Sequence, residues 1–179
     1  MENIQEAIAK IDSSLVFRRR FGASSMGVYE VEKAGSVYVL KVSGKNYLWG
    51  IQHIEQERQL LSRAKKISGI THLVHDYGNT IYGKAILKEY FEGTNLYYLS
   101  TRVRNKKLQE KLENTVKEIH SLGFGKLDLN EVNTVLSPDF QDVCLIDLGY
   151  AVSFENFPSS RIEEIKFFDL DALKLFVFG

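Results

Sequence analysis

Two stretches in the second half of the chain carry carboxylate and amide side chains that could bind a metal ion or accept a proton. Asp128 and Asn133 stand five residues apart, and Asp147 follows directly after an apolar run and precedes Leu148-Gly149. Asp and Asn also favour ordinary turns, so each stretch alone has a purely structural interpretation. Together they supply two carboxylates and an amide, which are hard oxygen ligands suited to Mg²⁺ bound to phosphate.

A lysine and a glutamate in the first half form a second pair of candidate groups. Lys41 stands between apolar neighbours on a predicted strand, and Glu57 points into the apolar stripe of the next predicted helix, whereas Glu55 points largely away from it. A carboxylate is costly to bury without a partner, so we expect a buried cation opposite Glu57. Lys41 is the candidate, and such a fixed lysine could bind a polyphosphate.

A third candidate is the small-residue segment Gly22–Tyr29 between two predicted strands. Gly22, Ser24 and Gly27 would let backbone N–H groups approach phosphate oxygens closely. An ordinary glycine-containing hairpin is the alternative interpretation.

The elements that must position these residues follow from the hydrophobic periodicity of the chain. Helices are predicted over 3–11, 48–67, 106–122 and 161–178, and strands over 15–21, 27–32, 36–43, 73–77, 81–90, 134–136 and 143–146. A β-rich half with one main helix, beginning as an antiparallel meander, therefore precedes a helix-rich half. The sequence predicts an α+β fold.

The composition excludes several classes of protein. The 179 residues are 44% hydrophobic and 26% charged, as in globular domains, and no apolar run approaches the roughly 20 residues that cross a bilayer. Lys plus Arg and Asp plus Glu both total 23, so the charge gives no case for nucleic acid. The N-terminus lacks an apolar signal core, and Cys144 is the single cysteine. A reducing, cytoplasmic location is expected.

The order of these parts resembles the protein-kinase-like fold over about residues 17–175. The shared parts are a glycine loop, a strand lysine, a helix glutamate, an Asp-Leu-x-x-x-Asn loop at Asp128 and an Asp-x-Gly turn at Asp147. Leu87–Gly93 also looks like the hinge between two lobes, and Asp169 looks like the helix aspartate that supports the catalytic loop.

The resemblance implies a compact bilobal fold. A single kinase-like domain would span 1–179, with an antiparallel β N-lobe and one main helix over 1–92. The hinge would lie near 89–95, and a truncated helical C-lobe would cover 96–179. ATP would bind in the interlobe cleft, where small-molecule sites often form.

The resemblance also implies roles for the nucleotide-binding residues. Gly22, Ser24 and Gly27 would cover the phosphates, and the backbone of Glu89 and Phe91 would hydrogen-bond adenine.

For catalysis, the resemblance assigns Lys41, fixed by Glu57, to the α- and β-phosphates. Asp147 and Asn133 would bind Mg²⁺ or Mn²⁺, and Asp128 would accept the proton of the attacking hydroxyl.

Several residues depart from the protein-kinase pattern. Lys126-Leu127 precedes Asp128 where His-Arg is usual, Asn130 replaces a lysine, and Lys88 is a polar gatekeeper. The chain is more similar to compact atypical kinases: the RIO type, the small kinases of the tRNA-modifying KEOPS complex, and the lipopolysaccharide sugar kinases.

The expected function is that of an ATP-dependent phosphotransferase similar to an atypical serine/threonine protein kinase. Its acceptor would be a hydroxyl of a protein or a small molecule, which keeps a sugar kinase open. The alternatives are a pseudokinase or nucleotide-binding scaffold, and a module whose truncated C-lobe binds a protein partner. Four phenylalanines would mark that surface, unless they cover the core of the lobe itself: Phe167, Phe168, Phe176 and Phe178.

Overall fold

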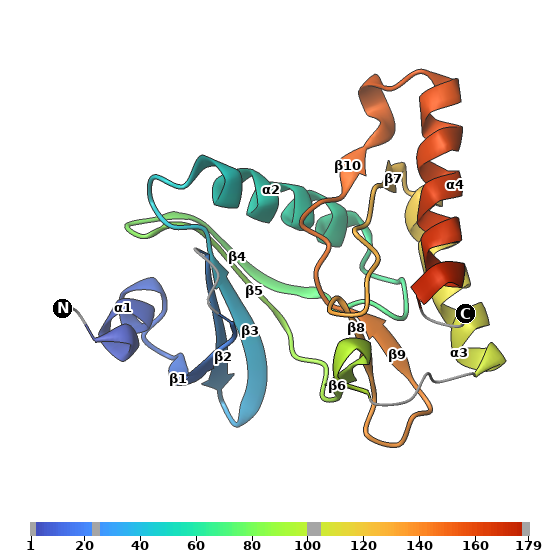
Figure 1. The fold of residues 1–179 in the computed structure, drawn as a ribbon. Coiled ribbons are helices and arrows are strands. Elements are labelled where there is room, and N and C mark those ends of the chain that lie inside the picture. Colours follow the sequence, from blue (N-terminus) through green and yellow to red (C-terminus); the bar gives the residue numbers. More distant parts are fainter. Residues whose placement is uncertain (1–2, 23–25, 100–104, 177–179) are drawn as a thin grey trace. The chain divides into compact units, whose positions relative to one another are not determined.

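The structure, a computed structural model, describes residues 3–22, 26–99 and 105–176. Within them, four α-helices and a five-stranded antiparallel sheet make a mixed fold, so the expected α+β class is confirmed (Figure 1). The chain divides into two units. The first comprises Met1–Arg58 and His72–Tyr90, and the second comprises Gln59–Thr71 and Phe91–Gly179.

The first unit contains the five-stranded sheet. Its strands are β1 (Val16–Arg20), β2 (Gly27–Lys33), β3 (Ser36–Val42), β4 (Leu73–Thr80) and β5 (Gly83–Glu89), in the order β1-β2-β3-β5-β4. Each neighbouring pair is antiparallel. Ala34 and Gly35 join β2 to β3 with φ angles of 51° and 80°, as a tight hairpin turn with two left-handed residues requires.

Two helices pack against opposite faces of this sheet. On one face, Ile8 of α1 (Ile4–Ile11) packs in a cluster with Leu40 and Val42 of β3. On the other face, Ile54 of α2 (Leu48–Arg63) packs with Ile86 of β5. Alternation along the strands produces this division, because successive side chains point to opposite faces of a sheet.

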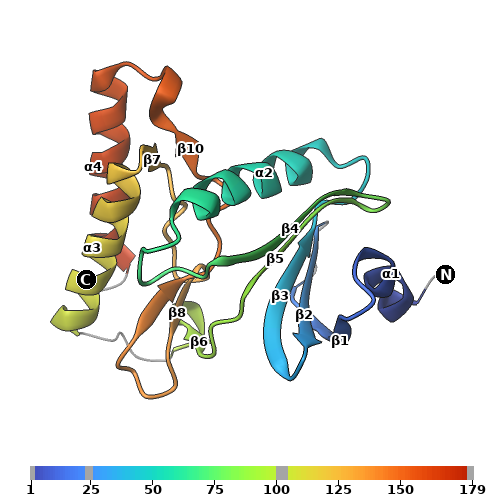
Figure 2. The ribbon, with the colours of Figure 1, turned by 180° about the vertical axis from the view of Figure 1, so that it is seen from behind.

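The second unit is built on two long helices and short antiparallel pairs. The helices α3 (Lys106–Ser121) and α4 (Ser159–Phe176) lie side by side (Figure 2). The short elements are β6 (Thr94–Asn95), η1 (Leu96–Tyr98), β7 (Phe124–Gly125), β8 (Thr134–Leu136), β9 (Val143–Leu145), β10 (Val152–Ser153) and η2 (Phe154–Asn156). They pair as β6-β8-β9 and β10-β7.

The main correction to the predicted elements concerns the helix expected over 48–67. It ends at Arg63, and the chain then turns so that Ile70 forms a bridge with Leu145 in the second unit. Ile67 and Ile70 are buried there, so tertiary packing rather than continued helix accounts for their apolar character. The two-residue strands β6, β7 and β10 were not predicted, because two residues show no periodicity.

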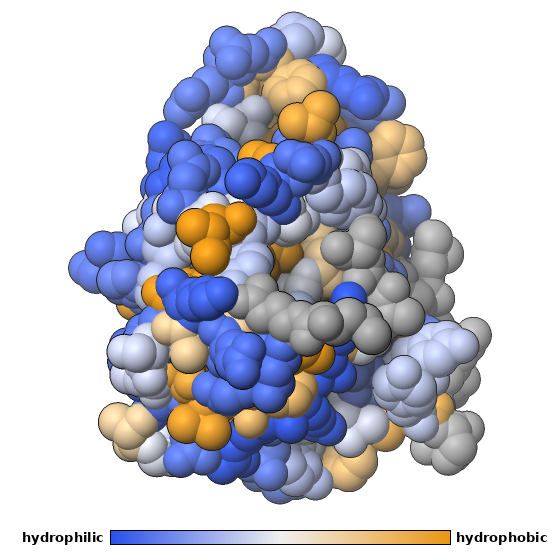
Figure 3. Space-filling view, turned by 90° about the vertical axis from the view of Figure 1, so that its left-hand side faces the viewer, coloured by the Kyte–Doolittle hydropathy of each residue, from blue (hydrophilic) through white to orange (hydrophobic). Residues whose placement is uncertain are grey.

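Apolar residues are scattered over the surface on the side where α1 lies in Figure 1. In that view, hydrophobic residues form small separate patches among hydrophilic ones (Figure 3). Among the described residues, no helix combines the length and apolar character that a membrane crossing requires.

Asp12, at the C-terminal end of α1, ties that helix to the sheet. Its Oδ2 accepts hydrogen bonds from Lys33 Nζ at 2.9 Å and from the Tyr77 hydroxyl at 2.7 Å. Its Oδ1 accepts from the Ser14 backbone N–H at 2.9 Å and from the Ser14 hydroxyl. Burial acts to raise the pKa of Asp12, but these hydrogen bonds outweigh it and hold the pKa well below its usual value.

We expect Asp12→Asn to destabilise the protein by roughly 1–3 kcal/mol at pH 7, because Lys33 and Tyr77 lose a charged acceptor. The folded-state pKa of Asp12 is lowered, so its stabilisation is present above the unfolded value of about 3.9 and is lost as pH falls further. Urea unfolding of both proteins between pH 7 and pH 3 measures this. A stability difference that does not shrink below pH 4 would contradict it.

Candidate functional site

Glu57 of α2 is fully buried and binds two lysines of the sheet. Its Oε2 lies 2.7 Å from Lys41 Nζ, and its Oε1 lies 2.5 Å from Lys88 Nζ. The exposed fractions of the three side chains are 0% for Glu57, 3% for Lys41 and 2% for Lys88. The expected ion pair between Lys41 and Glu57 is thus confirmed, and Lys88 is a second partner that we did not predict.

Strand pairing explains why both lysines reach the same carboxylate. Lys41 on β3 pairs with Ile86 on β5, and Lys88, two residues after Ile86, pairs with Val39. Residues two apart on a strand share a face, so Lys41 and Lys88 both face α2. The alternation along β5 places Lys88 on the same face as Ile86 and can be seen in the sequence. Only the pairing register shows that β5 lies beside β3.

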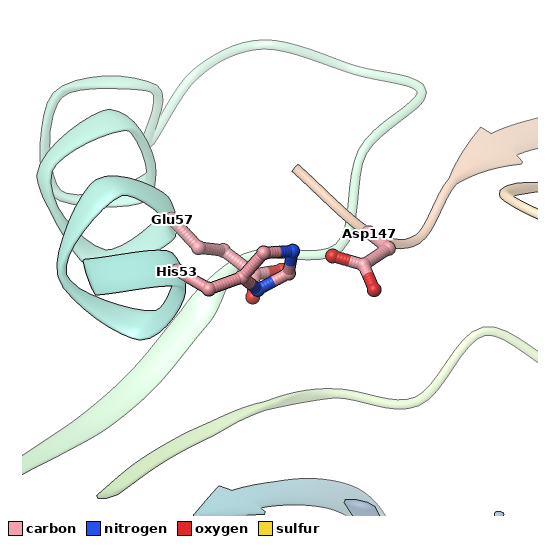
Figure 4. A group of neighbouring side chains, drawn as sticks. All are labelled: His53, Glu57 and Asp147. Carbon is pink, nitrogen blue, oxygen red and sulfur yellow. The ribbon is translucent and has the colours of Figure 1, made fainter. Parts of the chain in front are cut away.

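The face of α2 that carries Glu57 also carries His53, one helical turn earlier (Figure 4). His53 is buried and packs against Trp49, with 4.9 Å between ring centroids. Glu55 has a different environment, as expected: it is partly exposed and binds Arg58 and Lys84. These bonds give α2 a second ionic link to β5, through Lys84.

The glycine segment is described only in part. Gly22 has φ +60° and no atom within 4 Å of the position of an added Cβ, so a side chain there would meet strain rather than a clash. Gly27 opens β2, where an added Cβ would lie 2.5 Å from the Tyr29 ring. Ser24 lies outside the described residues. The expected close contact between backbone N–H groups of this segment and phosphate oxygens stays a prediction.

Glu89 and Phe91 lie on either side of the point where the chain leaves the first unit, after Tyr90. The Glu89 N–H donates to the His72 carbonyl at 2.9 Å. The Glu89 carboxylate contacts His72 Nδ1 at 2.9 Å and accepts from the His72 N–H at 3.1 Å. The Glu89 carbonyl is therefore the backbone group of this residue to consider for binding adenine.

In the second unit, Asp128 and Asn133 belong to one hydrogen-bonded loop. Asn133 Nδ2 donates to Asp128 Oδ2 at 3.0 Å and to the Asp128 carbonyl at 3.1 Å. Asn130 closes the loop, because its Oδ1 accepts the backbone N–H groups of Val132 and Asn133 and its Nδ2 donates to the Asp128 carbonyl. Asn130, a departure from the protein-kinase pattern, thus shapes the loop that carries Asp128.

The pairing of β8 with β9 brings Asp147 to the same end of this unit. Thr134 pairs with Leu145, and one step further the Ile146 N–H donates to the Asn133 carbonyl at 3.0 Å. Asp147, drawn in Figure 4, follows Ile146 in the loop after β9. Its Oδ1 accepts the Gly149 N–H at 3.2 Å. Asn133 and Asp147 therefore offer oxygen donors from adjacent chain segments, a donor set that fits a hard divalent cation.

Asp169 of α4 holds the segment that precedes Asp128. Its two carboxylate oxygens accept the backbone N–H groups of Lys126 at 2.9 Å and Leu127 at 3.0 Å. The contact expected between Asp169 and this loop is confirmed. It supports a strained backbone, because Lys126 and Asp128 have φ angles of 60° and 50°.

His120 of α3 is a further member of this network that sequence reasoning missed. Its Nε2 lies 2.9 Å from Asp169 Oδ2, and both side chains are buried. The signal was present, since His120 follows Val116 by four residues and so continues the apolar face of α3. A polar residue on such a face indicates a buried partner, but the partner lies 49 residues away.

Two of the four phenylalanines that could mark a partner surface or cover the core of the second unit are exposed. Phe167 and Phe168 are 61% and 59% exposed, so they do not cover the core. Their rings pack edge to face with centroids 5.8 Å apart. The side chain of Phe176, and all of Phe178, lie outside the described residues.

Comparison with known proteins adds no relative. A scan against protein-family models finds no match to the chain, and a search of curated proteins finds none either.

We expect Glu57→Gln to destabilise the protein by about 3–5 kcal/mol, because it leaves two buried ammonium groups without their shared carboxylate. Urea unfolding at pH 7 measures the loss. Glu55→Gln is the matched control on the same helix, and its partly exposed ion pairs predict a loss below about 1 kcal/mol. Equal losses for the two variants would contradict the central role of Glu57.

We expect Asp169→Asn to loosen the loop before Asp128, because each buried donor left without an acceptor costs roughly 1–3 kcal/mol. The asparagine keeps a single acceptor oxygen, so hydrogen exchange of at least one of the Lys126 and Leu127 amides should become faster. Asp171→Asn, on the same helix, is the control. Unchanged protection of both amides in Asp169→Asn would show that other contacts hold the loop.

Proposed function

We propose that the chain is an ATP-dependent phosphotransferase with a bilobal protein-kinase-like fold, transferring the γ-phosphoryl group to a hydroxyl acceptor. The observation that carries the proposal is the loop of the second unit, where Asn133 binds Asp128 and adjoins the chain segment that leads into Asp147. An amide and two carboxylates in the loops that adjoin two paired strands form the base and metal-ligand set that phosphoryl transfer needs.

On this proposal, Asp128 accepts the proton of the attacking hydroxyl. Its carboxylate is exposed, while Asn133 Nδ2 fixes one oxygen and Asp169 holds the preceding backbone. A base fixed in this way needs no reorganisation when the hydroxyl binds, and positioning supplies much of the rate in such reactions. Asn130 and Leu127 depart from the protein-kinase pattern, but both have a structural role here, because Asn130 closes the loop and Leu127 is a core residue. These departures are therefore no argument for a pseudokinase.

Asp147 and Asn133 would hold Mg²⁺ or Mn²⁺, whose charge would stabilise the phosphate oxygens of ATP. Lys41 would contact the α- and β-phosphates. Glu57 fixes the direction of the Lys41 ammonium, and Lys88 fixes Glu57 from the neighbouring strand. A preorganised cation of this kind stabilises developing charge more than a mobile lysine does.

Further residues would complete the nucleotide-binding site. Gly22, Ser24 and Gly27 would lie along the phosphates, and the backbone of Glu89 and Phe91 would bind adenine. The acceptor is a hydroxyl of a protein or of a small molecule, including a sugar. Radiolabelled ATP offered with serine-containing proteins and with polyols would distinguish these acceptors.

We expect Asp147→Asn to weaken metal-dependent ATP binding, because it removes a charged oxygen ligand. Asp128→Asn should spare ATP binding and lower turnover by about 10²–10³-fold, as loss of one group that acts in the transition state does. Calorimetric titration with ATP and Mg²⁺ measures binding, and phosphate release measures turnover. Asp139→Asn, in the exposed turn between β8 and β9, is the control and should change neither quantity.

The outcomes separate the proposal from its alternatives. If ATP binding depends on Asp147 but no acceptor is phosphorylated, the result would favour the nucleotide-binding scaffold. Absence of nucleotide binding by the folded protein would overturn both. Loss of ATP binding in a folded Asp128→Asn variant would remove the catalytic-base assignment alone.

A further inference from the structure

A cavity of about 530 Å³ lies in the first unit, between α1 and the sheet face that this helix covers. Its apolar and aromatic wall includes Ile4, Ala7, Ile11, Tyr29, Val42 and Tyr82. The volume falls within the range of roughly 300–1,000 Å³ that is typical of small-molecule sites. The cavity therefore has the size and the apolar lining of a ligand site.

Among its described lining residues, the cavity shares Gly27 with the proposed phosphotransferase residues of this unit, but neither Lys41 nor Glu57 lines it. Val42 points into it from β3, whereas the preceding residue, Lys41, points to the opposite face of the sheet and binds Glu57 of α2. Incomplete coverage by α1 explains the space. Ile8 packs fully into the core, but Ile4, one turn earlier, remains 39% exposed.

The charged residues described in the lining of the cavity are both positive. Among the described lining residues these are Arg20 of β1 and Lys45 of the β3–α2 loop, and none is a carboxylate. Both side chains are exposed, so they lie at the open rim while apolar side chains form the wall. A rim of two cations favours an anionic group at the entrance.

We propose that this cavity binds a small amphiphile with an apolar body and one anionic head group. The body buries its surface against α1 and the sheet, gaining roughly 25 cal/mol for each Å² removed from water. The head group stays at the rim, beside Arg20 and Lys45, where it keeps part of its hydration. The inference does not rest on the proposed phosphotransferase activity, because the apolar wall, Arg20 and Lys45 carry it and Gly27 plays no part in it.

An NMR titration of the whole chain with octanoate tests the proposal, because amide shifts report both affinity and location. We expect the largest shifts in α1 and around Val42 and Tyr82. 1-Octanol and octyltrimethylammonium are the matched probes, with the same chain and a neutral or cationic head. Octanoate should bind several-fold more tightly than either of them.

Substitutions separate the two parts of the site. Ala7→Phe should fill the cavity and reduce octanoate binding at least tenfold, whereas Glu6→Phe, on the exposed side of the same helix, should not. Arg20→Gln and Lys45→Gln should each weaken octanoate binding about threefold and leave octanol unchanged. Arg18→Gln is the control on the same strand.

Several results would overturn the proposal. These are no octanoate binding at millimolar concentration, shifts spread evenly over the chain, or equal affinity for the three probes. If Ala7→Phe fails to fold, the two cation variants still decide the outcome, because their exposed side chains can be replaced without disturbing the core. Octanoate affinity unchanged in both of them would exclude the anionic head group.

Discussion

The buried carboxylate of Glu57 is the constraint on which the first unit depends. A buried charge is tolerated only when it is paired with an opposite charge. Glu57 meets this condition through Lys41 on β3 and Lys88 on β5. Because each lysine comes from a different strand, the bonds fix the helix, both strands and the pairing register together. The cost of taking these charges out of water offsets much of their mutual attraction, so removing one partner destabilises the unit more than the intact pair stabilises it.

The same constraint organises the two faces of the sheet. On the α2 face, charged groups are fixed beside apolar ones such as Ile54 and Ile86. On the α1 face the side chains that pack in the core are apolar or aromatic, and the helix covers this face only in part. One alternation along β3, from Lys41 to Val42, thus separates a polar candidate site from an apolar cavity. A slip of one residue in the register would exchange the two.

The second unit uses hydrogen bonds rather than ion pairs to shape its candidate site. Asp169 holds two backbone amides before Asp128, and Asn130 closes the loop that follows. Lys126 and Asp128 adopt left-handed backbone angles that their side chains disfavour. Strain of this kind persists only where the surroundings determine the conformation, and here a buried carboxylate from α4 supplies that support.

The sequence by itself determined the principal helices and strands, because long amphipathic segments carry a clear periodicity. It also determined that Glu57 needs a buried cation, since that follows from the cost of burying charge. Only the tertiary structure decided that Lys88 is a second partner and that His120 meets Asp169. Those pairs join residues 31 and 49 positions apart. Which distant segments become neighbours depends on strand order and helix packing, and local periodicity carries no information about either.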